Sequence, residues 1–434
     1  MNKIEILNFN HYFKYYLILL GFCALTALNY KYNIGNDSTI SEWIINYQGG
    51  FIRRGLLGEI AFKLALLFDL SLGKVIFYMQ SISYLFLLFL NFIFFIKFRQ
   101  NIFTLFVIFT PIFILYPVAE IEVLARKEVF MYIFFLGLFF ISTVKDLIKN
   151  SFLNIYIIFI CPIVCLIYEQ FILFFPFILV YLIFEKNIKD LISFFRLLLN
   201  FIPSILIVSY FLFKPITYLQ HELMKKSLLE YFNEKCYMSC ELLFGNDITK
   251  FSDLLLYIYG ASSFKEISIW IFRYIIIFLI GFFPLLIMIF HSKIKKETIL
   301  TNFYKLNLIS IFTILFILIL PLFIFGSDWG RWVGMMISFS IYLYFFLIYK
   351  GHISVNYKKL IKSFSFLKNK KKIIIFIFVI FSFGWNQKTS ISGDIATNPL
   401  WKVPYNTLKK NFNFGSKRYF QDSPLIKWHK KYIE

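Results

Sequence analysis

Residues 75–96 read VIFYMQSISYLFLLFLNFIFFI, a stretch of the chain without a single charged side chain. An apolar run of about 20 residues is long enough to cross the hydrocarbon core of a bilayer as an α-helix. Comparable runs recur along the whole chain of 434 residues, 59% of which are hydrophobic. We therefore predict an all-α, polytopic integral membrane protein with about 11 transmembrane helices and with interfacial helices in its outer loops. The predicted spans are 12–30, 75–96, 102–119, 128–144, 152–168, 170–184, 197–213, 268–290, 306–325, 333–349 and 373–386.

The distribution of charge predicts the orientation of the chain. The net charge is +21, which taken alone would also suit a nucleic-acid partner. Lysines and arginines, however, gather in alternate short loops, whereas nearly all acids fall in the other loops. An excess of basic residues marks the cytoplasmic side of a membrane. We therefore place the N-terminus in the cytoplasm and expect no nucleic-acid partner. The basic loops are 97–101, 145–151, 185–196, 291–305 and 350–372.

The chain reads as one integral membrane domain, 1–434, with two long outer loops. The first, 31–74, contains a short apolar segment that we expect to lie along the interface as a helix. The second, 214–267, is long enough for two or three short helices. An odd number of spans leaves the C-terminal tail, 387–434, on the outer side. If the last apolar run only lies on the interface, ten spans remain and the tail is inside, so both topologies stay open.

The first outer loop contains the most unusual polar stretch, WIINYQGGFIRRGLLGE, at residues 43–59. Arg53 and Arg54 lie between glycines and apolar residues. A guanidinium group forms two parallel hydrogen bonds with phosphate oxygens, and nearby glycines allow close approach of the backbone. The stretch therefore favours binding of a diphosphate at the lipid boundary. The alternative is that both side chains reach for lipid headgroups.

Residues 120–128 form a second charged outer loop. It holds five charges in nine residues: Glu120, Glu122, Arg126, Lys127 and Glu128. We predict that Arg126 and Lys127 bind substrate and that Glu120 supplies a catalytic carboxylate. An ordinary solvated turn between two spans is the alternative.

Glu169 lies in a third outer loop, the tight turn 168–170. A turn this short needs no acid, and an ionised carboxylate near neutral pH can accept a proton from a hydroxyl group. Glu169 is therefore a candidate general base. The alternative is a turn residue at the level of the headgroups.

A fourth outer loop, residues 326–332, reads GSDWGRW. Asp328 and Arg331 are spaced to pair at i, i+3, and we predict that Asp328 is catalytic and that Arg331 binds substrate. The indoles of Trp329 and Trp332 would stack on sugar rings. The alternative for the two tryptophans is the aromatic belt found at membrane interfaces.

The sequence does not predict a cofactor. The five histidines are scattered without metal-ligand spacing, so we expect no metal site, although a divalent cation held by outer carboxylates remains an alternative. No phosphate-binding glycine motif or nucleophile elbow occurs. A glycosyl donor on the outer face must then carry its own leaving group, as a polyprenyl diphosphate sugar does. Cys236 and Cys240 could form a disulfide in the second long outer loop.

In topology the chain resembles the bacterial surface-polysaccharide proteins that include O-antigen polymerases of the Wzy type. These have about ten to twelve spans, a cytoplasmic N-terminus and one large outer loop, and they depend on outward arginines, which Arg53, Arg54, Arg126 and Arg331 would supply. The resemblance implies polymerisation of a polyprenyl-linked oligosaccharide in lipopolysaccharide synthesis. It also implies the bacterial cytoplasmic (inner) membrane, an extracytoplasmic active face, and contacts with the bilayer and with other polysaccharide-assembly proteins.

The chain is also similar to the GT-C glycosyltransferases, which use a polyprenyl-phosphate sugar and a catalytic acid in the first outer loop. Asp37 or Glu42, together with Glu120 or Glu122, stand at corresponding places. The paired acids often found just after the first span are absent here. A transporter or flippase is a further alternative, but such proteins place charges near mid-membrane, and here they gather at the outer ends.

Overall fold

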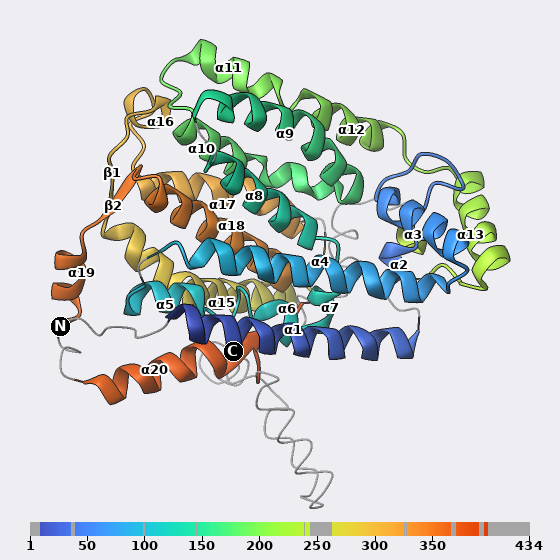
Figure 1. The fold of residues 1–434 in the computed structure, drawn as a ribbon, viewed down its shortest axis with the longest axis horizontal. Helices are drawn as coiled ribbons and strands as arrows, with labels where there is room; N and C mark the ends of the chain where they lie inside the picture. The colour runs from blue at the N-terminus through green and yellow to red at the C-terminus, as the bar shows by residue number, and fades with distance from the viewer. Residues whose placement is uncertain are drawn as a thin grey trace, which may run out of the picture.

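The computed structural model is a bundle of helices that run along the long axis of the molecule (Figure 1). The structure describes residues 9–35, 40–98, 100–143, 146–237, 239–243, 263–324, 326, 328–365, 370–389 and 395–397. Among them, strands form only two short antiparallel ribbons. One pairs β1 (Ser292–Ile294) with β2 (Ile353–Val355), and the other pairs β3 (Trp385–Gln387) with β4 (Ile395–Thr397).

The helices agree with the prediction of a multi-pass membrane protein. Five of those described are long and apolar enough to cross a bilayer, and a sixth crossing results if the bent pair α11 and α12 counts as one span. The five are α1 (Phe9–Ile34), α4 (Leu72–Phe95), α9 (Asp146–Ile167), α15 (Phe264–Phe290) and α18 (Trp329–Tyr349). The prediction of about 11 transmembrane helices is therefore confirmed only in part: the helical membrane class is supported, and the number of spans is not.

Three predicted spans are interrupted. The span 102–119 divides into α5 (Ile102–Ile108) and α6 (Tyr116–Ala119), because Pro111 lacks the N–H that a helix would need there. The span 170–184 begins with the 3-10 helix η1 (Glu169–Phe174) and continues as α10 (Phe175–Glu185).

In the third, the span 197–213, α11 (Leu191–Leu199) and α12 (Ile202–Phe213) meet at an angle of 56°. Pro203 lies in the first turn of α12, where a proline is tolerated and where a new helix readily begins.

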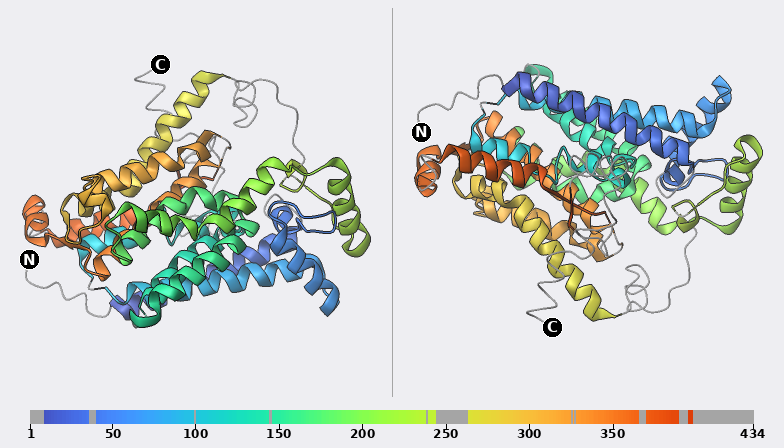
Figure 2. Two further views of the ribbon diagram at one scale, coloured as in Figure 1. Left: turned by 90° about the horizontal axis from the view of Figure 1, so that it is seen from above. Right: turned by 90° about the horizontal axis from the view of Figure 1, so that it is seen from below.

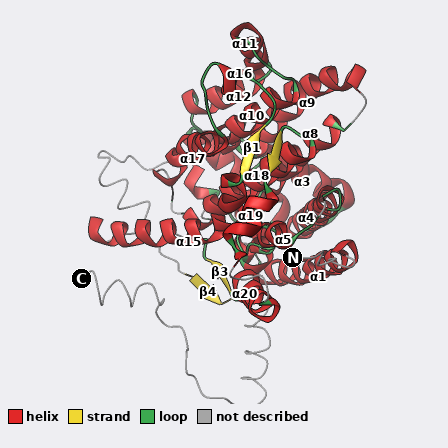
Figure 3. Ribbon diagram, turned by 90° about the vertical axis from the view of Figure 1, so that its left-hand side faces the viewer, coloured by secondary structure: helices red, strands yellow, loops and turns green. Residues whose placement is uncertain are grey.

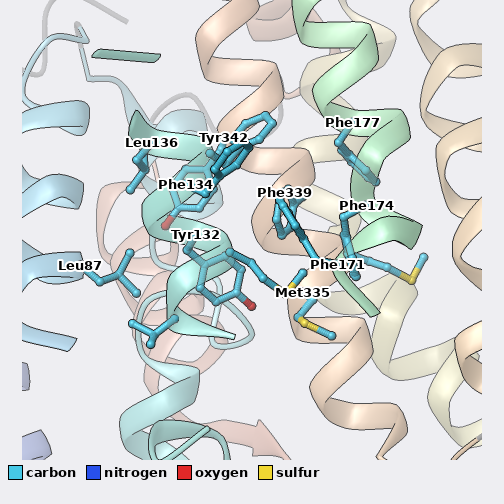
Figure 4. Close-up of a cluster of buried hydrophobic side chains, with 14 of the residues drawn as sticks. Leu87, Tyr132, Phe134, Leu136, Phe171, Phe174, Phe177, Met335, Phe339 and Tyr342 are labelled. Carbon is cyan, nitrogen blue, oxygen red and sulfur yellow. The ribbon is translucent and has the colours of Figure 1, made fainter. Parts of the chain in front are cut away.

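The centre of the bundle is α18, which is buried from Trp329 to Leu347. It packs against α10 and against α8 (Val129–Ser142). Aromatic rings pack around Phe339 of α18. Its ring centroid lies 4.8 Å from that of Phe174 at the end of η1 (Figure 4) and 5.2 Å from that of Phe135 on α8. Helices in lipid are held together by such van der Waals contact, so α18 fixes the positions of its neighbours.

The helices on the outside of the bundle surround this centre. α1 and α4 line one side, and α15 lies on the opposite side (Figure 2). α17 (Leu308–Ile324) packs on α15 and α18. α20 (Lys371–Phe383) lies beside α5, with ring contacts such as Phe106 to Phe378 at 5.2 Å. β3, which follows α20, packs against α6.

The two ends of the bundle differ. One end, which faces the viewer in Figure 3, carries β1, β2, α16 (Ile299–Asn302) and α19 (Tyr357–Ser363). The other end carries α2 (Ile40–Trp43), α3 (Gly55–Phe68), α7 (Ile121–Leu124) and α13 (Tyr218–Phe232) (Figure 1).

The predicted outer loops fall at this second end. The short helix expected in the loop 31–74 is α3. In the loop 214–267 the structure describes α13 and the 3-10 helix η2 (Glu241–Leu243). Residues 244–262 and most of the tail 387–434 lie outside the described residues.

Candidate functional site

Nine charged residues meet at the end of the bundle that carries α2 and α3, and we refer to them as the charged cluster. They come from the first outer loop, the α7–α8 turn, the α9–η1 turn and the start of α18. The cluster comprises Glu42, Arg53, Arg54, Arg126, Lys127, Glu128, Glu169, Asp328 and Arg331. The four outer loops that the sequence marks as polar therefore lie together in space.

Arg54 is the centre of the cluster. Its Nε lies 2.9 and 3.0 Å from the two carboxylate oxygens of Glu169, and its second terminal nitrogen lies 2.7 Å from one of them. Its other terminal nitrogen lies 3.6 Å from Glu42. Arg54 precedes α3 with a φ of 62°, a left-handed conformation that costs a non-glycine residue about 1–2 kcal/mol. The surrounding ion pairs hold the backbone in that form.

Glu42 is the most deeply buried acid of the cluster, with no exposed surface. Its carboxylate lies 3.1 Å from Arg126 in addition to its contact with Arg54. Burial alone would raise the pKa of Glu42, but the guanidinium groups of Arg126 and Arg54 outweigh it and lower the pKa to about 2. Glu42 is therefore ionised and acts as the counter-ion of two arginines.

Glu169, predicted as a general base, is also a counter-ion in this structure. Burial opposes ionisation, but the charge and hydrogen bonds of Arg54 lower the pKa of Glu169 below its ordinary value. A carboxylate with a depressed pKa and a bidentate arginine partner accepts protons poorly. In this structure Glu169 is thus held as the counter-ion of Arg54, and its role as a general base stays a prediction.

Lys127 is fully buried and links two loops of the cluster. Its Nζ donates a hydrogen bond of 2.7 Å to the backbone carbonyl oxygen of Arg54. Burial lowers the pKa of Lys127 to about 8, although the nearby charge of Glu42 works in the opposite direction. The side chain thus stabilises the loop before α3.

Arg331 connects the start of α18 to the cluster. Its side chain lies 3.1 Å from Glu128 and 3.1 Å from Asp328, which is the pairing at i, i+3 that the spacing predicts. It also donates to the hydroxyl oxygen of Tyr168 at 3.4 Å. Glu128 and Tyr168 have no predicted role in the sequence. The only feature of the sequence that points to them is their position: Glu128 follows Lys127, and Tyr168 precedes Glu169.

Arg53 differs from the other cations. It is half-buried, and within the described residues it forms no hydrogen bond or ion pair. Burial and the neighbouring charge of Arg54 lower the pKa of Arg53, whereas Glu169 raises it. The cluster contains five cations and four carboxylates. It therefore carries a positive excess, and Arg53 is the group available to an anion.

Glu120 lies outside this network. Its carboxylate pairs with Lys388, which follows β3, at 3.1 Å. Glu122 pairs with Lys31 at the end of α1 at 2.5 Å. These two acids fasten the loop 120–128 to other parts of the chain, so the predicted catalytic role of Glu120 finds no support in its contacts.

The two tryptophans of the loop 326–332 are buried, with exposed fractions of 8% for Trp329 and 3% for Trp332. Their rings lie 5.4 and 5.5 Å from that of Phe323 on α17. The indole N–H of Trp329 donates to the carbonyl oxygen of Gly326 at 3.2 Å. In this arrangement neither indole offers an open face to a sugar, because both side chains are buried in the protein.

The glycines of the stretch 43–59 serve packing rather than access to a ligand. A Cβ at Gly58 would lie 1.8 Å from the carbonyl oxygen of Ile45, and one at Gly49 would lie 1.9 Å from that of Gln220 on α13. Neither position has room for a side chain. At Gly49 and Gly58, the close approach that glycine allows is therefore to the protein's own backbone.

Cys236 and Cys240 form a disulfide. Together with His221 they form the one group of three potential metal ligands in the part of the chain that the structure describes. Their ligand atoms lie within 4.8 Å of one another. The two sulfurs are bonded to each other, and His221 Nε2 donates to the carbonyl oxygen of Cys240 at 3.1 Å. In this state the three residues are bonded among themselves rather than arranged to coordinate an ion.

The fold and the cluster define a class: a multi-pass helical membrane protein with a buried, positively charged ion-pair network at one end of its bundle. Comparison with protein-family models, with curated proteins and with solved structures finds no match for this chain.

Proposed function

We propose that the protein transfers glycan from a polyprenyl-diphosphate-linked donor, with polymerisation of an O-antigen or another surface polysaccharide as the reaction. In this proposal the chain crosses a bacterial cytoplasmic membrane 11 times, with its N-terminus in the cytoplasm and the charged cluster on the extracytoplasmic side. The basic loops named above fall at the opposite end, in keeping with the usual excess of lysine and arginine in cytoplasmic loops.

The observation that carries the proposal is the guanidinium of Arg53, which has no hydrogen bond or ion pair among the described residues and lies in a cluster of net positive charge. A half-buried cation is partly removed from water, so an anion that pairs with it regains part of the lost solvation. Arginine matches phosphate oxygens in a planar, bidentate geometry. A diphosphate attached to a lipid would present those oxygens at the membrane surface, where the outer loops lie.

The contacts support a division of roles among the cluster residues. Arg53 receives the diphosphate, and Arg54, Arg126, Lys127 and Arg331 supply the surrounding positive potential. Cations held in place before the reaction stabilise the negative charge that develops on a leaving group. Glu42 and Glu169 keep this arrangement folded as counter-ions.

Asp328 is our candidate for the carboxylate that activates the acceptor hydroxyl. Its side chain is 29% exposed, against 13% for Glu169, 4% for Glu128 and none for Glu42. An acceptor sugar has to reach the base directly. Among these four acids, Asp328 is the one most open to solvent.

The proposed partners are a polyprenyl-linked oligosaccharide, the lipid bilayer and other polysaccharide-assembly proteins. Arginines neutralise the departing diphosphate in this scheme. A divalent cation on the outer carboxylates is the alternative, and chelation with EDTA distinguishes the two, because only the metal-dependent reaction stops.

The test is replacement of Arg53 in the native gene. We expect Arg53→Ala to abolish the long-chain ladder of surface polysaccharide on a gel, and Arg53→Lys to restore little of it, since lysine cannot form the bidentate contact. Lys63→Ala is the matched control, because Lys63 is 72% exposed and, among the residues that the structure describes, pairs with Glu59 alone. A normal ladder with Arg53→Ala would refute the diphosphate site.

The form of the glycan in a gene deletion separates this function from its alternatives. Retention of a single repeat unit with loss of long chains indicates a polymerase. A shortened or undecorated repeat indicates a GT-C transferase that uses a polyprenyl-phosphate sugar. Accumulation of lipid-linked repeat units inside the cell indicates a flippase. Unchanged glycan would contradict all three.

A further inference from the structure

Helix α13 of the second long outer loop packs directly on the loop that carries Arg53 and Arg54. Thr217 and Gln220 form a capping box that fixes the start of α13. The backbone of Gly49 lies so close to Gln220 that a Cβ there would be 1.9 Å from its carbonyl oxygen. At the other end of α13, the ring of Phe232 meets that of Phe62 on α3 at 5.0 Å. α13 is thus held along the first outer loop at both ends.

The segment after α13 returns to the charged cluster through a closed loop. The disulfide joins Cys236 to Cys240, and the described residue Ser239 lies inside the ring that it closes. His221 on α13 donates to the carbonyl oxygen of Cys240 at 3.1 Å, which fixes the loop to the helix. Both His221 and Cys240 are buried. The loop therefore has a defined position relative to α13.

Ser239 contacts Arg126, one of the two arginines around Glu42. The same terminal nitrogen of Arg126 lies 3.5 Å from the Ser239 hydroxyl oxygen and 3.1 Å from Glu42. Next to this contact, the indole N–H of Trp43 donates to the carbonyl oxygen of Ala125 at 2.7 Å. The disulfide loop thus meets the cluster where the first outer loop and the α7–α8 turn join.

We propose that the Cys236–Cys240 disulfide positions Arg126, with Ser239 as the positioning residue, so that the geometry of the charged cluster depends on the redox state of this pair. The inference rests on these contacts and not on the proposed glycan transfer. Reduction by a dithiol breaks the S–S bond, delivers two electrons and two protons to give two thiols, and converts the reductant to its own disulfide. The opened loop then no longer holds Ser239 against Arg126.

The test is hydrogen–deuterium exchange of the full-length protein in detergent, with and without dithiothreitol. We expect reduction to speed exchange in residues 40–46 and 124–130 by about two- to threefold, because the 3.5 Å contact that is lost is weaker than an ordinary hydrogen bond. Ser239→Ala keeps the disulfide and should speed exchange at the same two segments. The variant with both Cys236→Ser and Cys240→Ser should exchange as fast as the reduced protein. Dithiothreitol should not change its exchange, since the remaining cysteines are free.

The variant Arg126→Gln tests whether the disulfide acts through Arg126 or only stabilises its own loop. If the disulfide acts through Arg126, reduction should add nothing to exchange in residues 40–46 of this variant, because coupled residues are not additive. Two results would overturn the proposal. One is faster exchange confined to residues 217–243 on reduction. The other is an equal effect of reduction on residues 40–46 with and without Arg126.

Discussion

Replacing Glu42 with glutamine would remove the counter-ion of two buried arginines. Glu42 has no exposed surface, and it lies 3.1 Å from Arg126 and 3.6 Å from Arg54. Glutamine keeps the shape of the side chain but not its charge. Removal of one partner from a buried ion pair leaves the other charge uncompensated, which costs about 3–5 kcal/mol.

The pKa of Glu42 gives an independent magnitude. It falls from an ordinary value of 4.5 to about 2, and each unit corresponds to about 1.4 kcal/mol. The ionised carboxylate therefore stabilises the fold by about 3 kcal/mol at neutral pH. Both routes give an effect of the same order.

The assay is thermal unfolding of the purified protein in detergent. We expect Glu42→Gln to lower Tm by roughly 5 °C, allowing for the smaller shift per kcal/mol in a long chain. Glu222→Gln is the matched control, because Glu222 is 41% exposed and pairs with Lys225 on the surface. An exposed pair of this kind contributes little, so the control should melt with the wild type.

A double variant tests whether the cost comes from the unpaired arginines. Adding Arg126→Gln to Glu42→Gln removes one of the stranded charges, so the double variant should lose less than the sum of the two single variants. The reasoning fails if Glu42→Gln melts within about 1 °C of the wild type. It fails equally if the two losses simply add.

Three further outcomes are expected from the structure. The folded pKa of Glu42 is depressed, so its contribution is present above about pH 4.5 and is lost as pH falls toward 2; acid should lower Tm more steeply in the wild type than in Glu42→Gln. Gly58→Ala should prevent stable folding, since its Cβ would meet the Ile45 carbonyl, whereas Gly73→Ala meets only ordinary contacts and should be tolerated in expression and melting tests. Tyr342→Phe should cost about 1–3 kcal/mol in thermal unfolding, because it leaves the buried side-chain oxygen of Asn91 without its 2.9 Å hydrogen bond.

The membrane class and the meeting of the polar loops could be predicted from sequence. Long apolar runs fix the approximate positions of helices such as α4 and α15. Charge alternation then assigns the loops around Arg54, Arg126, Glu169 and Arg331 to one side. Loops on the same side of one helix bundle lie near one another, so their convergence follows.

The sequence could not predict which charges pair. Arg54 and Glu169 are 115 positions apart, and their contact depends on how α3 and α9 pack. The break within the span 102–119 occurs at Pro111, which is visible in the sequence, whereas the 3-10 turn that begins the span 170–184 depends on local packing that hydropathy does not report. Burial of Trp329 and Trp332 requires the position of α17, and no residue spacing encodes it.

The pairing pattern makes Arg53 and Arg54 unequal, although they are neighbours in the sequence. An anion that bound Arg54 would have to displace Glu169 from three contacts of 2.7 to 3.0 Å and leave a buried carboxylate without a partner. An anion that bound Arg53 would displace no partner among the described residues. A phosphate group should therefore engage Arg53 first, while Arg54 keeps the two carboxylates in place. Alanine at position 53 consequently tests binding, whereas alanine at position 54 disturbs the fold of the cluster as well.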